Sequence, residues 1–172
     1  MQKRKRGERC ILFDWGDTLM RDIPGQDGPM ATWPEVVVLP GAREVLEELQ
    51  GGWRLALATN AAASDEKDIR AALARGGLDG FWDVIFCYRS VGHRKPSPEF
   101  FVHALESLSL PPSACVMVGD AFDSDIVGAN RAGIRGVWLN ERDGENREGE
   151  MYRTIHRLSD LPAVLADWAA IV

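Results

Sequence analysis

Acidic residues stand at the ends of two short apolar runs that lie far apart in the chain. Asp14 follows the run CILF, and Asp120 follows the run VMVG. Such runs are typical of buried strands, and the carboxyl edge of a parallel sheet is where open α/β proteins bind their ligands. Two carboxylates at one such edge would bind a hard divalent cation. The sequence therefore predicts a cation site that contains Asp14, which would also be available as a nucleophile.

Three further segments carry polar residues beside a predicted strand or helix. Thr59-Asn60 follows the run LALA, Lys95 precedes a predicted helix, and Asp125 follows Asp120 in the same segment. Each has a simpler structural explanation when taken alone. Thr59, for example, could form a hydrogen bond with its own backbone in a loop. Their order along the chain, each at the end of a regular element, favours one shared site.

The elements that must position these residues alternate regularly along the chain. Helices are predicted at 41–50, 64–75, 97–108, 123–132 and 161–168, with Ser64 as the expected cap of the second, and strands at 10–13, 53–58, 84–87, 114–118, 136–139 and 152–156. This alternation requires right-handed crossovers and a mainly parallel sheet with helices on both faces. We therefore predict an α/β fold, a Rossmann-like three-layer sandwich.

The length of 172 residues predicts a single domain, residues 1–172. Two segments interrupt the alternation. Residues 19–40, rich in proline and glycine, are expected to form a flap-like insert over the site, and residues 140–151 a loop for which no chemistry is predicted. Neither residues 19–40 nor residues 60–94 leave room for a helical cap domain.

The composition argues against several classes of partner. The net charge of -6 disfavours binding to nucleic acid or to an anionic membrane. The basic cluster Lys3 to Arg6 is expected to belong to a solvated tail, residues 1–8. Three cysteines in apolar runs share no metal spacing and predict small core residues in a reducing compartment. With no signal peptide or membrane span predicted, we expect a cytoplasmic protein.

Taken together, the four motifs resemble those of the haloacid dehalogenase-like (HAD) hydrolase superfamily, from about residue 9 to about residue 140. The resemblance implies a magnesium-dependent phosphatase that works through an aspartyl-phosphate on Asp14. It implies that the Mg²⁺ ligands are Asp14, the backbone carbonyl of Gly16, Asp120 and Asp125. Magnesium suits such a set because it prefers oxygen ligands.

The resemblance also assigns roles to the other polar residues. Lys95 would offset the negative charge of Asp14 and of the phosphoryl group, and the Thr59 hydroxyl would hold a phosphoryl oxygen together with nearby backbone N–H groups. Residues expected to contact the substrate are Trp15, Gly16 and Asn60.

The first motif departs from the pattern of the superfamily. Its phosphatases usually read DxDGT, and the second Asp protonates the leaving oxygen and later activates water. This chain reads DWGDT, so that Gly16 stands at the acid's position and Asp17 one place further along. General acid–base catalysis is worth about 10² to 10⁴ in rate.

Three hypotheses about the missing acid stay open. Asp17 could turn into the site and serve as the catalytic acid. The substrate could instead have a good leaving group, as an acyl phosphate has. Alternatively, the protein could bind phosphorylated ligands with little turnover.

Two other branches of the superfamily that lack the second Asp fit less well. The 2-haloacid dehalogenases work without a metal and carry Asn where Asp120 stands. Phosphonoacetaldehyde hydrolases need a Lys from a helical cap, and residues 19–40 contain none. A capless site would be open, with Arg21 and Trp33 of the insert as expected contacts. Capless relatives accept large substrates or borrow a lid from another subunit, so we expect a small or larger phosphorylated substrate and allow for a homo-oligomer.

Overall fold

The computed structural model of the chain describes residues 6–170 and contains one sheet of six strands. Its strands are β1 (Cys10–Phe13), β2 (Arg54–Thr59), β3 (Val84–Cys87), β4 (Cys115–Gly119), β5 (Arg135–Leu139) and β6 (Tyr152–Ile155). They are arranged in the order β3-β2-β1-β4-β5-β6, and every neighbouring pair is parallel. The predicted parallel α/β sheet is therefore confirmed.

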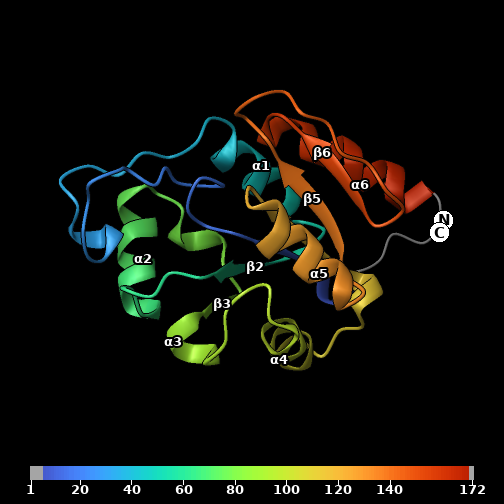
Figure 1. The fold of residues 1–172 in the computed structure, drawn as a ribbon, viewed down its shortest axis with the longest axis horizontal. Coiled ribbons are helices and arrows are strands. Elements are labelled where there is room, and N and C mark those ends of the chain that lie inside the picture. Colours follow the sequence, from blue (N-terminus) through green and yellow to red (C-terminus); the bar gives the residue numbers. More distant parts are fainter. Residues whose placement is uncertain (1–5, 171–172) are drawn as a thin grey trace.

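Helices cover both faces of this sheet (Figure 1). They are α1 (Ala42–Leu49), α2 (Glu66–Arg75), the short α3 (Tyr88–Val91), α4 (Pro98–Leu108), α5 (Gly128–Arg131) and α6 (Leu161–Ala170). One buried apolar cluster joins a face of the sheet to α1, α2 and α6, and a second joins the opposite face to α4 and α5. The alternation of side chains along each strand supplies both clusters, which confirms the three-layer sandwich.

Two helix starts differ from the sequence-based expectation. The cap of α2 is Asp65 rather than Ser64, because Asp65 and Asp68 exchange side-chain and backbone hydrogen bonds in a capping box. The helix predicted at 123–132 begins as a π-helical segment, Phe122–Val127, before it continues as α5. That segment carries Asp125, whose carboxylate accepts the N–H of Ala121.

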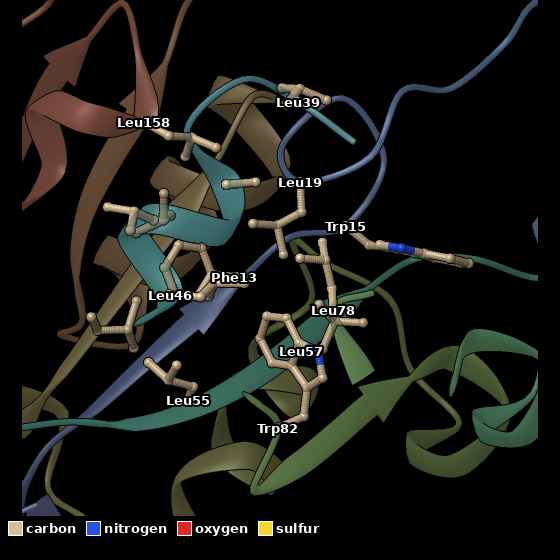
Figure 2. Close-up of a cluster of buried hydrophobic side chains, with 14 of the residues drawn as sticks. Phe13, Trp15, Leu19, Leu39, Leu46, Leu55, Leu57, Leu78, Trp82 and Leu158 are labelled. Carbon is tan, nitrogen blue, oxygen red and sulfur yellow. The ribbon is translucent and has the colours of Figure 1, made fainter. Parts of the chain in front are cut away.

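The loop that follows β1 is anchored in the hydrophobic core. Phe13, Trp15 and Leu19 are all buried and pack with side chains from β2 and α1 (Figure 2). The indole N–H of Trp15 donates to the Met20 sulfur at 3.2 Å. Apolar packing against the core thus holds the backbone between Asp14 and Met20 in place.

The insert at residues 19–40 contains only one short helical segment, the 3-10 helix Met30–Thr32. The guanidinium of Arg75 on α2 donates to three carbonyls of the insert, those of Ala31, Trp33 and Pro34. Figure 1 shows this part of the chain beside α2, and no helical cap is present within residues 6–170.

The N-terminal basic cluster lies mostly outside the described residues. Lys3, Arg4 and Lys5 fall outside them, whereas Arg6–Glu8 form a 3-10 helix. The three cysteines are buried and free, as small core residues are expected to be. In the part of the chain that the structure describes, no helix has the length and apolar character needed to cross a membrane.

Candidate active site

The residues singled out from the sequence meet at the carboxyl edge of the sheet. The chain runs from β1 to β2 on one side and later adds β4 on the other, so the ends of these strands border a topological switch point. A cleft of about 500 Å³ opens there. It is lined by all of the predicted site residues: Asp14, Trp15, Gly16, Asp17, Thr59, Asn60, Lys95, Asp120 and Asp125.

A buried lysine connects two of the carboxylates. The Lys95 side chain is 1% exposed, and its Nζ lies 2.8 Å from Asp14 Oδ1 and 2.7 Å from Asp125 Oδ1. Burial alone would lower the pKa of Lys95, but the attraction of Asp14 and Asp125 outweighs it and raises the pKa. Lys95 is therefore a permanent cation that holds both carboxylates in place.

Asn60 fixes the position of this lysine. Its side-chain amide donates to the Lys95 carbonyl at 2.8 Å, and its amide oxygen accepts the Lys95 backbone N–H at 2.8 Å. The amide thus pairs with the Lys95 backbone in the way that a neighbouring strand would. Contact between Asn60 and a substrate stays a prediction, and the pairing gives this residue a positioning role.

Two threonine hydroxyls form hydrogen bonds in the loops at the strand ends. The buried Thr59 hydroxyl oxygen accepts the N–H of Ala61 at 3.1 Å, as the simpler explanation of this motif expected. Thr18 was not predicted as a site residue. Its hydroxyl donates to Asp14 Oδ2 at 3.4 Å and accepts the Asp120 N–H at 3.2 Å. Its place in the DWGDT run was the only sequence signal for this role.

Three carboxylates form a cluster with the composition of a cation site. Oxygen atoms of Asp14, Asp120 and Asp125 all lie within 4.8 Å of one another. Burial, and then the charge of Asp14, raises the pKa of Asp120 to about 7 and the pKa of Asp125 to about 6. The repulsion between these carboxylates thus adds to the effect of burial. A hard divalent cation such as Mg²⁺ fits this set of oxygen donors.

Gly119 lets Asp125 approach the end of β4. A Cβ atom at position 119 would overlap the Asp125 carboxylate. A glycine is therefore required before Asp120, because any larger residue would displace the Asp125 carboxylate from Lys95.

Asp17 lines the cleft, but its carboxylate already has several partners. Its Oδ1 accepts the backbone N–H of Asp22 at 3.2 Å and lies 3.7 Å from the Arg21 guanidinium. Its Oδ2 lies 3.8 Å from Arg142. The residue has a φ of 51°, a left-handed conformation that Asp adopts more readily than most residues. Its role as the catalytic acid stays a prediction.

The loop at residues 140–151, for which the sequence predicts no chemistry, contributes to the cleft. Arg142 lines the cleft and donates to Asp120 Oδ2 at 3.0 Å, and Glu141 pairs with Arg21 at 2.9 Å. The Arg142 side chain is 74% exposed, so this ion pair is weak and easily exchanged. Sequence reasoning missed Arg142 because contact across two loops leaves no local pattern.

The insert supplies the remaining wall of the cleft. Gly28, Met30 and Trp33 line it, as does Asp22, which was not singled out from the sequence. Of the two contacts expected from the insert, Trp33 faces the cleft, whereas Arg21 pairs with acidic residues beside it.

Comparison with known proteins identifies the family of the chain. A family model described as haloacid dehalogenase-like hydrolase matches residues 26–133. The chain belongs to this family. The match begins after Asp14, so the variant first motif lies outside it.

The HAD-like chain is similar to enzymes whose activities are named. It is 35% identical over 112 residues to the pyrimidine 5'-nucleotidase YjjG of Escherichia coli K12, covering 64% of this chain and 48% of that enzyme. It is 30% identical over 142 residues to the N-acylneuraminate-9-phosphatase of Rattus norvegicus, covering 82% of this chain and 50% of that enzyme. The chain thus spans about half the length of these relatives.

Solved structures share the HAD-like fold over most of the chain. An uncharacterized protein from Listeria monocytogenes serotype 4b superimposes with a TM-score of 0.79 at 32% identity, covering 92% of this chain and 97% of that one. A 2-haloacid dehalogenase from Pseudomonas syringae superimposes with a TM-score of 0.75 at 22% identity, covering 94% and 99%. The second likeness supports the fold alone.

Proposed function

We propose that this HAD-like chain is a magnesium-dependent phosphohydrolase that acts through a phosphoryl group on Asp14. The observation that carries the proposal is the convergence of Asp14, Asp120 and Asp125 around the buried Lys95 at a cleft. The similarity to enzymes named as a nucleotidase and a phosphatase supports the same reaction class.

Each residue has a definable task in this proposal. Lys95 lies 2.8 Å from Asp14 Oδ1, so its ammonium group offsets the charge of the nucleophile and orients it. The Thr59 hydroxyl, whose oxygen accepts the Ala61 N–H, is left to donate its hydrogen to a phosphoryl oxygen.

The carboxylates of Asp14, Asp120 and Asp125, with the Gly16 carbonyl as the predicted fourth ligand, would hold Mg²⁺, which would neutralise phosphoryl charge. Five carboxylates and only two cations line the cleft, and this excess of negative charge favours binding of such an ion.

A second function is favoured by one observation, the glycine at position 16. Without an acid, the same site could bind phosphorylated ligands and turn them over slowly. This alternative predicts binding without phosphate release across a broad panel of phosphate esters.

Chelation tests the leading proposal. We expect phosphate release from acetyl phosphate and from an aryl phosphate in the presence of Mg²⁺, and loss of that release when EDTA removes the ion. Return of activity on adding excess Mg²⁺ is the control for damage by the chelator. Release that continues unchanged in EDTA would contradict the proposal, and binding without release would favour the alternative.

The raised pKa values of Asp120 and Asp125 predict a pH dependence of metal binding. In the metal-free protein both pKa values exceed the ordinary 3.8, so the folded state holds extra protons, and the stability they add is lost as pH rises through about 6 to 7. Mg²⁺ must displace these protons. We therefore expect millimolar Mg²⁺ to raise the Tm by several degrees at about pH 8 and much less at about pH 5.

Thermal unfolding with and without Mg²⁺ at the two pH values measures this effect. Asp120→Asn should remove most of the pH dependence of the Mg²⁺ shift. A Mg²⁺ shift that is equal at both pH values, or larger at the lower one, would contradict the assignment of these ligands.

A further inference from the structure

The space above Gly16 is filled by the side chain of another acidic residue. A Cβ atom built on Gly16 would lie 2.7 Å from Asp22 Cγ and 2.8 Å from Asp22 Oδ1. These distances are shorter than any van der Waals contact, so the Asp22 carboxyl group occupies the volume in which a side chain at position 16 would start. A carboxyl group from the insert therefore lies directly beside Gly16, the position at which the usual acid is absent.

The backbone around Asp22 is held firmly enough to keep this position. The Asp22 N–H donates to Asp17 Oδ1 at 3.2 Å, and the Arg21 N–H donates to the Val37 carbonyl at 2.8 Å. Met20 forms bridges with both Gly16 and Val38. The strand-like pairing of the insert therefore sets where the Asp22 side chain leaves the backbone.

Among the carboxyl groups that line the cleft, only that of Asp22 forms no ion pair or hydrogen bond within residues 6–170. Asp14 and Asp125 bind Lys95, Asp120 binds Arg142, and Asp17 contacts two arginines and a backbone N–H. No ion pair or hydrogen bond engages the oxygens of Asp22 in that part of the chain, although the residue lines the cleft. The residue as a whole is exposed.

We propose that Asp22 is the catalytic acid and base of this site, with Asp17 as the residue that positions it. The inference rests on the proposed phosphohydrolase function. It assigns the proton transfers to a residue in the insert. Asp17 positions this residue, because the Asp17 carboxylate accepts a hydrogen bond from the Asp22 backbone N–H.

Asp22 transfers one proton in each half-reaction. In the first, an Asp14 oxygen forms a bond to phosphorus, the bond to the leaving oxygen breaks with its electron pair, and the protonated Asp22 carboxyl gives its proton to that oxygen. In the second, the Asp22 carboxylate takes a proton from water while the water oxygen attacks phosphorus. The bond from phosphorus to Asp14 breaks, its electron pair returns to Asp14, and inorganic phosphate leaves.

The dependence on the leaving group separates this role from a structural one. For Asp22→Asn, we expect kcat/KM to fall by about 10² to 10⁴ with an alkyl phosphate, and by less than about tenfold with acetyl phosphate, whose leaving group needs no proton. Asp27→Asn, an exposed carboxylate of the same insert, is the matched control and should change neither value.

A second readout reports on the other half-reaction. With acetyl phosphate, Asp22→Asn should accumulate phosphorylated protein, detected as the added mass of one phosphoryl group after acid quenching, because loss of the base slows its hydrolysis. Equal losses of kcat/KM with both substrates and no accumulation would overturn the assignment of Asp22.

Moving the carboxyl group back to position 16 provides a third test. Gly16→Asp alone should gain nothing, since its new side chain collides with Asp22. Gly16→Asp combined with Asp22→Ala should recover at least tenfold of the kcat/KM that Asp22→Ala loses with the alkyl phosphate. A gain in Gly16→Asp alone would contradict the idea that Asp22 already fills this place.

A wrong assignment of Asp22 and a failure of the phosphohydrolase proposal would give different results. If Asp22 is wrongly assigned, wild-type turnover and phosphorylation of Asp14 persist and Asp22→Asn behaves like Asp27→Asn. If the phosphohydrolase proposal fails, the wild-type protein forms no phosphorylated species with any substrate, and the role of Asp22 fails with it.

Discussion

Asp14→Asn is expected to lower turnover by on the order of 10⁴-fold or more for every phosphorylated substrate, because the amide cannot form the bond to phosphorus. The Tm should stay the same or rise. The substitution removes one carboxylate from the cluster and leaves Lys95 paired with Asp125 at 2.7 Å. Initial rates with acetyl phosphate and an alkyl phosphate, together with thermal unfolding, measure both effects.

The leaving group should not matter for this variant, which distinguishes it from Asp22→Asn. A residual rate within tenfold of the wild type would show that Asp14 is not the nucleophile. A large fall in Tm would instead indicate that the loss of activity reflects unfolding.

Lys95→Met should cause the largest loss of stability of any substitution in the site. It removes the cation from Asp14 and from Asp125, whose side chains are 14% and 1% exposed. Breaking a buried ion pair on one side costs about 3 to 5 kcal/mol of the free energy of unfolding. Because burial raises the pKa of Asp125 to about 6, this carboxylate can take up a proton at low pH, and the loss should be larger at about pH 8 than at about pH 5. Urea unfolding at the two pH values measures it.

Two further variants control for this result. Lys67→Met removes an exposed lysine on α2 and should change the free energy of unfolding by less than about 0.5 kcal/mol. Adding Asp125→Asn to Lys95→Met should recover part of the lost free energy of unfolding, because the variant then has one buried carboxylate fewer without a cation. If Lys95→Met unfolds at the same urea concentration as the wild type, Lys95 does not balance these carboxylates.

Much of the fold could be predicted because its signals are local. Short apolar runs such as residues 10–13 mark buried strands, and the polar residue after each run lies at the carboxyl edge of the sheet. The convergence of Asp14, Lys95 and Asp125 follows from parallel strands that end on the same side.

The parts that could not be predicted depend on contacts between irregular segments. Asp22 reaches Gly16 because the insert folds back through the bridges of Met20, and Arg142 reaches Asp120 from a loop without regular structure. No periodic pattern in the sequence predicts the contact of Asp22 with Gly16 or that of Arg142 with Asp120. The same limit applies to Asn60, whose type suggested a ligand contact although its amide holds the Lys95 backbone.

The measurement that tests the central claim most directly is the location of the phosphoryl group. The protein is mixed with acetyl phosphate and Mg²⁺, quenched with acid, digested and analysed by mass spectrometry. A phosphoryl group on Asp14 is predicted for the wild-type protein, with a larger amount in Asp22→Asn and none in Asp14→Asn. Phosphate release without any phosphoryl group on Asp14, or with one on a different residue, would contradict the mechanism.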